Sequence, residues 1–157
     1  MKLKSKKVKQ CLLCKNKKLR QIFSLGNLFV SNFVNKKDIN NGIRAPLKLL
    51  YCQNCELIQL SHIAPQQVIY KRFYWYRSGI TKTMNLALQN IFKESLKYVK
   101  LNVNDVVLDI GANDGTLLKF YKEKKIKTIG CEPANNLQNT LKKNCDHALN
   151  DFWSKEK

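Results

Sequence analysis

Four of the six cysteines stand in two C-x2-C pairs that are separated by 37 residues. A C-x2-C pair presents two thiolates to one side of a metal ion, and two pairs complete the tetrahedral set that Zn²⁺ prefers. The sequence therefore predicts one structural zinc ion, bound by Cys11, Cys14, Cys52 and Cys55. A redox role is the alternative for a C-x-x-C pair, but two pairs in one small segment favour a metal. His62 could replace one ligand, although a full cysteine set favours a structural role for it.

A second candidate site follows the apolar run Val106–Ile110. The run leads into Gly111–Gly115 and then into apolar residues at helical spacing, the order typical of a buried strand, a tight loop and a helix start. The first βα unit of a Rossmann-like sheet begins in this way. Gly111 lets the chain turn sharply and a ligand approach, and Asn113 is of a residue type that tolerates a positive φ. Gly115 would let the new helix pack close to the strand.

A carboxylate follows the loop at the spacing of an adenosine-binding site. Lys127–Glu132 is typical of a second strand that ends in an acid, and Glu132 lies 21 positions after Gly111. A carboxylate about 20 residues after the loop accepts hydrogen bonds from a ribose diol. The loop lacks the G-x-G-x-x-G spacing of dinucleotide sites, and Asp114 at the helix start would repel a diphosphate.

S-adenosylmethionine fits this loop better, because it has no phosphate and carries a sulfonium and an ammonium group. We therefore predict an S-adenosylmethionine site whose contacts are Asp109, Gly111, Ala112, Asn113, Gly115, Glu132 and Pro133. The alternative is a helix-capping acid in an α/β unit that binds no ligand.

The elements that must position the cysteines form a small N-terminal module. The segment between the two pairs is longer than in common zinc fingers and carries several turn signals, so it must be structured. Apolar groups at Leu28–Val30 and Phe33–Val34 could cover the metal core. Leu47–Tyr51 and Leu57–Leu60 flank the second pair like the two strands of a hairpin.

Aromatic side chains crowd the next segment, Tyr70–Arg77. Such residues can form a wall or lid over a pocket, with Tyr74 and Tyr76 as candidates for lining an acceptor pocket. A mixture of basic and aromatic residues can also stack nucleotide bases. Packing of a linker between two modules explains the same residues without any ligand.

The remaining elements alternate in the manner of an α/β domain. Apolar residues recur at intervals of three and four over Ile80–Val99, which predicts an amphipathic helix. A helix over 116–124 should follow the glycine loop. A further helix, capped by Asn135 or Asn136, should extend to about residue 143. The chain ends just where a third strand should develop, near Ala148.

Three side chains outside the candidate sites are expected to have structural surroundings. Cys131 should be a small buried residue of the second strand, and Cys145 should be a loop thiol. His147 should lie at the surface.

The 157-residue chain has a formal net charge of +18, which suggests contact with nucleic acid. However, only four of its basic residues are arginine, and Lys and Asn are both abundant along the chain, as an AT-rich coding bias also produces. The run Met1–Lys9 has no apolar core behind it, so it is not a secretory signal, and no apolar run reaches membrane-spanning length. Six cysteines without a signal indicate a reducing compartment, and we expect a soluble cytoplasmic protein.

Together these motifs resemble the S-adenosylmethionine-dependent methyltransferases that carry an N-terminal zinc-binding domain, several of which act on nucleotide-linked sugars. The cysteine pairs match the zinc knuckles of that family, and Ala45–Leu60 matches the segment around the second pair. Tyr74–Gly79 resembles the aromatic hinge of the family. Asp109–Gly115 and Gly130–Pro133 resemble its cofactor motifs. The resemblance covers nearly the whole chain.

The resemblance implies an α/β fold with a basic tail over 1–9, a zinc-binding module over 10–62, an aromatic hinge over 63–79 and a partial Rossmann-like cofactor domain over 80–157. It implies methyl transfer, of the sugar C-methyltransferase type, to a nucleotide-linked sugar or related small molecule, with zinc and S-adenosylmethionine as cofactors. The catalytic base is expected beyond residue 157. Because two strands of the expected sheet precede the end of the chain, the chain is expected to be an N-terminal fragment that is inactive alone.

Two other functions stay open at this point. A basic zinc-ribbon module could bind nucleic acid, because eight lysine and arginine residues crowd around the first cysteine pair. That function leaves the segment from Asp109 to Glu132 without a role. The chain could also be a non-functional remnant. The sequence does not indicate the methylated atom or the oligomeric state, and it predicts no contact with a membrane.

Overall fold

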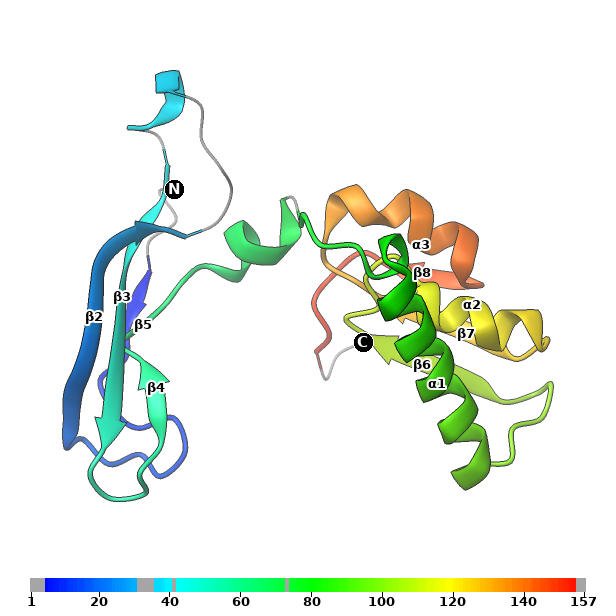
Figure 1. Ribbon diagram of the computed structural model, residues 1–157, viewed down its shortest axis with the longest axis horizontal. Coiled ribbons are helices and arrows are strands. Elements are labelled where there is room, and N and C mark those ends of the chain that lie inside the picture. Colours follow the sequence, from blue (N-terminus) through cyan, green and yellow to red (C-terminus); the bar gives the residue numbers. More distant parts are fainter. Residues whose placement is uncertain (1–4, 31–35, 41, 73, 155–157) are drawn as a thin grey trace. The chain divides into compact units, whose positions relative to one another are not determined.

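The computed structural model describes residues 5–30, 36–40, 42–72 and 74–154 (Figure 1). The chain divides into two compact units, Met1–Ile69 and Tyr70–Lys157. In the described residues no helix combines the length and the apolar character that crossing a bilayer requires.

The first unit is built on an antiparallel sheet with the strand order β2-β3-β4. Its strands are β2 (Leu19–Phe29), β3 (Arg44–Cys52) and β4 (Ile58–Leu60). Strands β3 and β4 pair with Leu49 opposite Leu60 and Tyr51 opposite Ile58, which confirms the predicted hairpin around the second cysteine pair. Strand β2 continues without interruption through Gly26 and Asn27, two residues that are typical of a turn. The register shifts there, and Gly26 has φ +75°, so the turn signal marks a bulge within a strand.

A second, shorter pairing lies at the start of the unit. Strand β1 (Lys6–Lys7) pairs antiparallel with β5 (His62–Ile63), so part of the segment expected as a basic tail is a strand. A 3-10 turn, η1 (Lys36–Asp38), lies between β2 and β3, and a π-helical turn, η2 (Gln67–Lys71), follows β5.

The prediction that Leu28–Val30 cover the metal core is wrong. In the register of the β2-β3 pair, Leu19 lies opposite Cys52, whereas Leu28 lies opposite Ala45 at the far end of the ribbon. Phe29 instead packs under the guanidinium of Arg44, which lies 4.3 Å from the ring centroid. The other apolar pair of that prediction, residues 33 and 34, falls outside the described residues.

The second unit is a three-stranded parallel sheet with helices. A 3-10 turn, η3 (Ser78–Ile80), leads into α1 (Lys82–Tyr98), close to the predicted helix. The strands β6 (Val106–Ile110), β7 (Lys127–Cys131) and β8 (His147–Leu149) follow one another in the sheet. Between them lie α2 (Thr116–Glu123), the turn η4 (Asn135–Leu137) and α3 (Gln138–Asn144). The expectation that only two strands are present is therefore wrong, because β8 pairs with β7 through Ile129, Gly130 and Cys131.

The helices pack on one face of this sheet. Leu118 of α2 and Leu141 of α3 are fully buried with Cys145, and Val107 and Ala148 of the sheet pack against them. Phe92 of α1 joins a neighbouring cluster that also contacts Val107. Alternate sheet residues on the other face stay exposed, namely Val106, Leu108, Ile110 and Leu149.

Three expectations about single residues can now be compared with the fold. Cys131 is buried in β7 as predicted, and His147 is exposed. Cys145 lies in the bend between α3 and β8, as predicted for a loop thiol; it is 1% exposed and belongs to the core, with its thiol directed at the carbonyl of His147 (3.2 Å).

Candidate functional site

Four sulfur atoms converge in the first unit. Cys11 and Cys14 lie in the turn after β1, Cys52 ends β3 and Cys55 lies in the β3-β4 turn. Their Sγ atoms all lie within 4.8 Å of one another, with 3.5 Å between Cys11 and Cys55 and between Cys14 and Cys52. Ligands at the Zn–S distance of about 2.3 Å in a tetrahedron stand roughly 3.8 Å apart. The sulfur positions therefore fit a tetrahedral Zn²⁺ ion.

The two cysteine pairs share one backbone fold. In the first, the carbonyl of Cys11 accepts the N–H of Lys15 (3.1 Å); in the second, the carbonyl of Cys52 accepts the N–H of Glu56 (2.9 Å). Lys15 and Glu56 both have φ +63°, a left-handed conformation directly after the second cysteine of each pair. Two equivalent turns thus present two thiols each from opposite sides of one point.

The electrostatics of the cluster also favour a bound cation. The backbone N–H of Asn16 is the largest of the influences that bring the pKa of Cys14 to about 6. At Cys55 the N–H of Leu57 acts in the lowering direction, but burial and three neighbouring thiols outweigh it and raise the pKa to about 12. Four sulfurs at this spacing cannot all be thiolates without a positive ion between them. A divalent metal would let all four ionise.

Gln59 of β4 holds the first cysteine pair in place, a role that the sequence did not reveal. Its side-chain carbonyl accepts the N–H of Leu12 (2.9 Å), and its amide donates to the carbonyl of Gln10 (3.4 Å). It is 6% exposed. His62 does not belong to the sulfur cluster, and its Nδ1 instead lies 2.9 Å from the hydroxyl of Ser61.

The glycine loop of the second unit follows β6 with three residues in the left-handed region. Gly111, Asn113 and Gly115 have φ of +80°, +53° and +77°, which confirms the expectation for Asn113. The N–H groups of Gly111 and Ala112 both donate to the carbonyl of Cys131, at 2.8 and 3.1 Å. A Cβ placed on Gly111 would meet nothing within 4 Å, so the backbone is open to a ligand here.

The reason predicted for Gly115 is wrong. A Cβ at Gly115 would lie 2.9 Å from the Cβ of Asn144 and 3.0 Å from Leu141 Cδ1. The residue therefore gives close packing against α3, not against the preceding strand. The side chain of Asn144 also donates to the carbonyl of Asp114 (2.8 Å), which fixes the end of the loop to the same helix.

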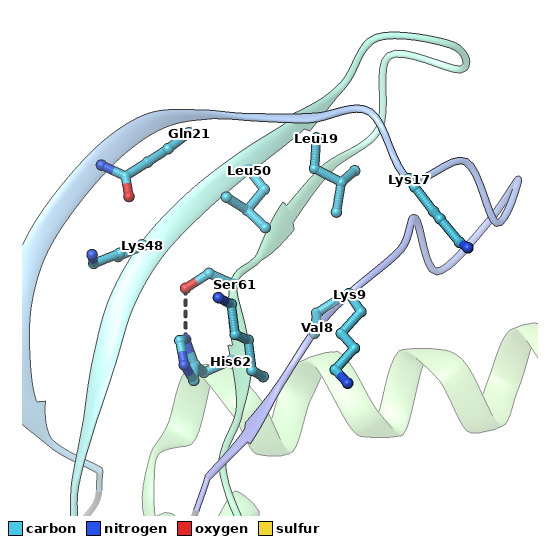
Figure 2. Close-up of a pocket in the computed structure, with 10 residues that line it drawn as sticks. Val8, Lys9, Lys17, Leu19, Gln21, Lys48, Leu50, Ser61 and His62 are labelled. Atoms are coloured by element: carbon cyan, nitrogen blue, oxygen red, sulfur yellow. Dashed lines mark hydrogen bonds between the residues drawn. The ribbon is translucent and has the colours of Figure 1, made fainter.

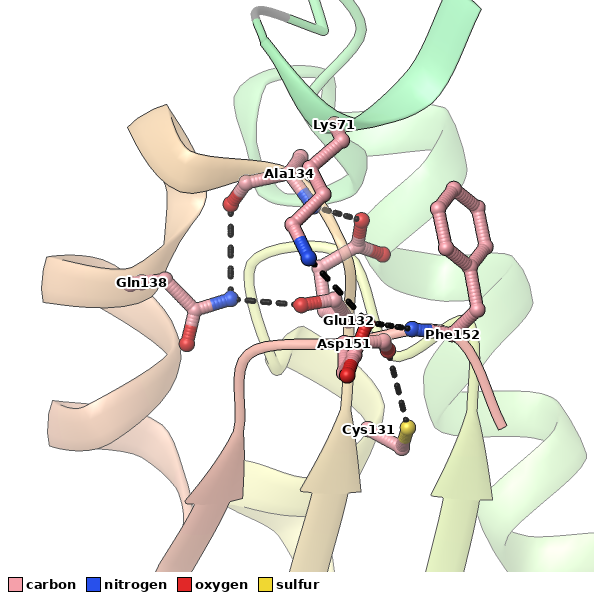
Figure 3. Close-up of polar contacts among 7 residues, drawn as sticks. All are labelled: Lys71, Cys131, Glu132, Ala134, Gln138, Asp151 and Phe152. Atoms are coloured by element: carbon pink, nitrogen blue, oxygen red, sulfur yellow. Dashed lines mark hydrogen bonds and ion pairs between the residues drawn. The ribbon is translucent and has the colours of Figure 1, made fainter. Parts of the chain in front are cut away.

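Glu132 stands at the end of β7 beside this loop, and its carboxylate is 5% exposed (Figure 3). One oxygen accepts the N–H of Asn113 (2.9 Å), and the other accepts the N–H of Ala134 (2.8 Å). The side chain of Gln138 donates to the backbone carbonyl of Glu132 (2.7 Å). Each carboxylate oxygen keeps a second lone pair, so Glu132 both shapes the loop and retains capacity for a ligand hydroxyl.

Asp109 lies one residue before the end of β6. Burial, followed by the charge of Glu132, raises its pKa above the ordinary carboxyl value. The charge of Glu132 thus disfavours the ionised form of Asp109, and a positively charged ligand would relieve this effect. Pro133, the last of the predicted contacts, is half-buried between Glu132 and Ala134.

The side chains of the loop are used in an unexpected way, because they bind the aromatic hinge. The side-chain carbonyl of Asn113 accepts the backbone N–H of Ser78 (2.9 Å), and its side-chain amide donates to the backbone carbonyl of Tyr76 (3.1 Å). The carboxylate of Asp114 accepts the N–H of Gly79 (2.8 Å). It also accepts the N–H and the hydroxyl of Thr116, the first residue of α2. These bonds tie the hinge to the loop within the second unit.

A third asparagine completes this attachment. Asn136 accepts the N–H of Tyr74 and donates to the carbonyl of the same residue, both at 2.9 Å. The expectation that Asn135 or Asn136 caps a helix is therefore wrong, and the first turn of α3 has no side-chain cap. The rings of Tyr74 and Tyr76 lie edge to face, with 6.4 Å between centroids, so the two predicted acceptor-pocket residues contact each other.

The end of the described chain packs next to the same strand end. Lys71 forms an ion pair with Asp151 (3.1 Å), and the thiol of Cys131 donates to the carbonyl of Asp151 (3.1 Å), as Figure 3 shows. Gln138 Oε1 is buried without a hydrogen-bond partner among the described residues.

Comparison with known proteins agrees with the first of these sites. Residues 11–70 match a family model of methyltransferases that is described as "Putative zinc binding domain". This range includes all four clustered cysteines. The C-methyltransferase NovU of Streptomyces niveus is 21% identical to the chain over 132 residues, which cover 83% of this chain and 31% of the relative. The chain thus spans about a third of the length of that relative. The chain is thus similar to methyltransferases, and its N-terminal part matches their zinc-binding domain.

Proposed function

We propose that the chain is the zinc-binding and cofactor-binding part of an S-adenosylmethionine-dependent methyltransferase that acts on a nucleotide-linked sugar. The observation that carries this proposal is the pairing of an open, left-handed glycine loop with two carboxylates, Asp109 and Glu132. The parallel sheet with its loop at the carboxyl ends of the strands supports a Rossmann-like arrangement. The reducing cytoplasm is the proposed location, because it keeps the zinc ligands as thiols.

Charge explains why this cofactor suits the loop. A bound S-adenosylmethionine supplies an electrophilic methyl group on a sulfonium and also carries an ammonium group. Asp109 would hold the ammonium end, because burial and the charge of Glu132, which raise its pKa, make a neighbouring cation favourable. The open backbone at Gly111 allows close approach, and Glu132 would accept hydrogen bonds from the ribose hydroxyls.

The hinge has a matching role on the acceptor side. The backbones of Tyr74 and Tyr76 are anchored by Asn136 and Asn113, which fixes the position of both side chains. A half-exposed tyrosine offers both an apolar face and a hydroxyl, which suits a sugar ring. We propose these two residues as contacts of the acceptor.

The zinc ion has a structural role in this proposal. Four thiolates form a closed tetrahedral set with no open position for a substrate. The ion would join the two ends of the first unit, because the cysteine pairs lie 37 residues apart in the sequence and come from different turns.

Nucleic-acid binding is the second candidate, and one observation favours it. Residues 1–69 contain thirteen lysine and arginine residues but only two acidic residues, Asp38 and Glu56. Phosphate backbones attract such a surface, and the affinity falls steeply with salt. This function gives no role to the loop or to Glu132, so we place it second.

Titration calorimetry of the zinc-loaded chain distinguishes the two functions. We expect S-adenosylmethionine or its demethylated product to bind, and Asp109→Ala to weaken binding at least tenfold, with Asp105→Ala, outside the loop, as the control. Absence of cofactor binding by a folded chain, together with salt-sensitive binding of generic DNA or RNA, would replace the first proposal by the second.

A further inference from the structure

The first unit holds a second feature that neither the zinc cluster nor the methyl-transfer proposal uses. A hollow of about 630 Å³ opens between the two sheets of the unit (Figure 2). Small-molecule sites range over roughly 300–1,000 Å³, so the hollow can take a nucleotide-sized ligand.

The walls of the hollow are tied together by backbone hydrogen bonds. The N–H of Val8 donates to the carbonyl of Ser61, and the N–H of Ser61 donates to the carbonyl of Lys48, both at 2.9 Å. Strand pairing also sets Lys7 opposite His62 and Gln21 opposite Leu50. Val8 and Ser61 are buried. The hollow is therefore a fixed part of the fold.

The charged side chains that line the hollow are all positive. Four lysines line the hollow: Lys7, Lys9, Lys17 and Lys48. Among the described residues, no acidic side chain lines the hollow and no ion pair engages these four lysines. Four ammonium groups around one concave surface raise the local concentration of anions, and lysine is a common ligand of phosphate.

The remaining lining residues add a polar and an apolar part. Ser61 and His62, joined by a 2.9 Å hydrogen bond, and Gln21 can donate or accept hydrogen bonds. Val8, Leu19 and Leu50 give an apolar floor that a flat ring could cover. An inorganic anion alone would leave the apolar floor exposed to water, whereas a nucleotide would cover the apolar floor and also contact the lysines.

We infer that this hollow binds a nucleoside diphosphate, with the lysines on the diphosphate and the apolar floor under the base. The inference concerns the first unit alone and does not depend on the loop of the second unit or on methyl transfer. A concave site with an apolar floor favours a small ligand over a nucleic-acid strand, which needs an extended basic groove.

Calorimetry of the zinc-loaded chain with uridine diphosphate, pyrophosphate and uridine tests the inference. We expect uridine diphosphate to bind more tightly than pyrophosphate, and uridine to bind too weakly to measure. The double variant Lys17→Gln/Lys48→Gln should lose at least tenfold in affinity. Its matched control is Lys36→Gln/Lys37→Gln, which removes the same charge from exposed positions of η1 in the same unit and should change affinity less than twofold.

Several outcomes would overturn the inference. Equal losses in the two double variants would mean a general charge effect, and equal binding of pyrophosphate would remove the base from the site. Tighter binding of a 12-nucleotide RNA, weakened alike by both variants, would assign the charge to nucleic acid. Zinc content confirms the fold of each variant; if the first double variant loses zinc, Lys17→Gln alone, at an exposed position, answers the same question.

Discussion

The side-chain carbonyl of Asn113 accepts a hydrogen bond from the backbone N–H of Ser78, 35 residues earlier in the chain, at 2.9 Å. The same side chain donates to the carbonyl of Tyr76 (3.1 Å), while the backbone N–H of Asn113 binds Glu132 (2.9 Å). One residue therefore connects the hinge, the glycine loop and the acid at the end of β7. A change at Asn113 should therefore reach Tyr76 of the hinge by this route.

Removal of this side chain should destabilise the second unit. Asn113→Ala leaves the N–H of Ser78 and the carbonyl of Tyr76 without their partners, and we expect a loss of roughly 2 kcal/mol in the free energy of unfolding. Asn113→Gly, which adopts the φ of +53° without strain, should lose less but still be weaker than wild type. Urea unfolding measures both, with the exposed Asn135→Ala as the control. Wild-type stability of Asn113→Gly would show that the two side-chain bonds contribute nothing.

These observations show which parts of the molecule the sequence predicts. Short-range patterns were sufficient for the β3-β4 hairpin and the β6-loop-α2 unit, because each follows from residues that are neighbours in the sequence. The zinc cluster follows from two such patterns, because each C-x2-C pair supplies half of a tetrahedral set. The positive φ of Asn113 was predicted in the same way. The partners of its side chain were not, since a hydrogen bond across 35 residues leaves no periodic signal.

The errors have a similar physical origin. Strand β2 is exposed on both faces along most of its length, so it lacks the alternation that marks a half-buried strand, and Gly26 within it indicated a turn instead. Asparagine is a common helix cap, but the side chain of Asn136 instead forms two hydrogen bonds with the backbone of Tyr74. In both cases tertiary contacts override a local preference.

Metal content provides the second prediction. We expect one zinc ion per chain and expect Cys52→Ser, at the end of β3, to lose it, because three thiolates cannot complete the set. Loss of the metal should unfold the first unit, since metal binding and folding are linked. Elemental analysis and circular dichroism with and without a strong chelator measure this. Cys131→Ser, a buried thiol outside the cluster, is the control and should keep its zinc. Zinc-free chain purified without chelators would contradict the prediction.

Substitution of Glu132 tests the proposed ribose contact. Charge-assisted hydrogen bonds contribute roughly 1.5–3 kcal/mol, so Glu132→Ala should weaken cofactor binding by one to two decades at about 1.4 kcal/mol per decade. The carboxylate also accepts the N–H groups of Asn113 and Ala134, so part of any loss could come from a loosened loop. Glu132→Gln separates the two effects, because it keeps the shape and one acceptor oxygen. An unchanged titration isotherm for both variants would remove Glu132 from the site.

Methyl transfer by this chain alone is not expected. The reaction needs an acceptor in line with the sulfonium and, for a carbon or hydroxyl acceptor, a base within hydrogen-bond reach. In the described part of the second unit the one histidine, His147, is exposed on β8. We expect cofactor binding without turnover when the purified chain is incubated with labelled S-adenosylmethionine and a nucleotide-linked sugar. Labelled sugar product, absent with the Asp109→Ala variant, would show that a base has been overlooked.

The last prediction concerns the charge of Asp109. Burial and the neighbouring charge of Glu132 raise its pKa in the folded chain above the ordinary carboxyl value of about 3.9. A carboxyl group with a raised folded-state pKa binds its proton more tightly when folded, so its ionisation reduces stability as the pH rises from the ordinary value to the raised one. Above the raised value the full penalty remains.

Asp109→Asn should therefore increase the stability of the cofactor-free chain at pH 7, and this gain should disappear near pH 3, where the carboxyl is protonated in both states. Thermal unfolding of wild type and variant at the two pH values measures the difference. The same variant should bind the cofactor more weakly, because the charge that costs stability in the free chain is the one that holds the ammonium group. Asp105→Asn, outside the loop, serves as the control. A variant that is less stable than wild type at pH 7 would mean that Asp109 contributes to the fold itself and is not a group kept charged for a ligand.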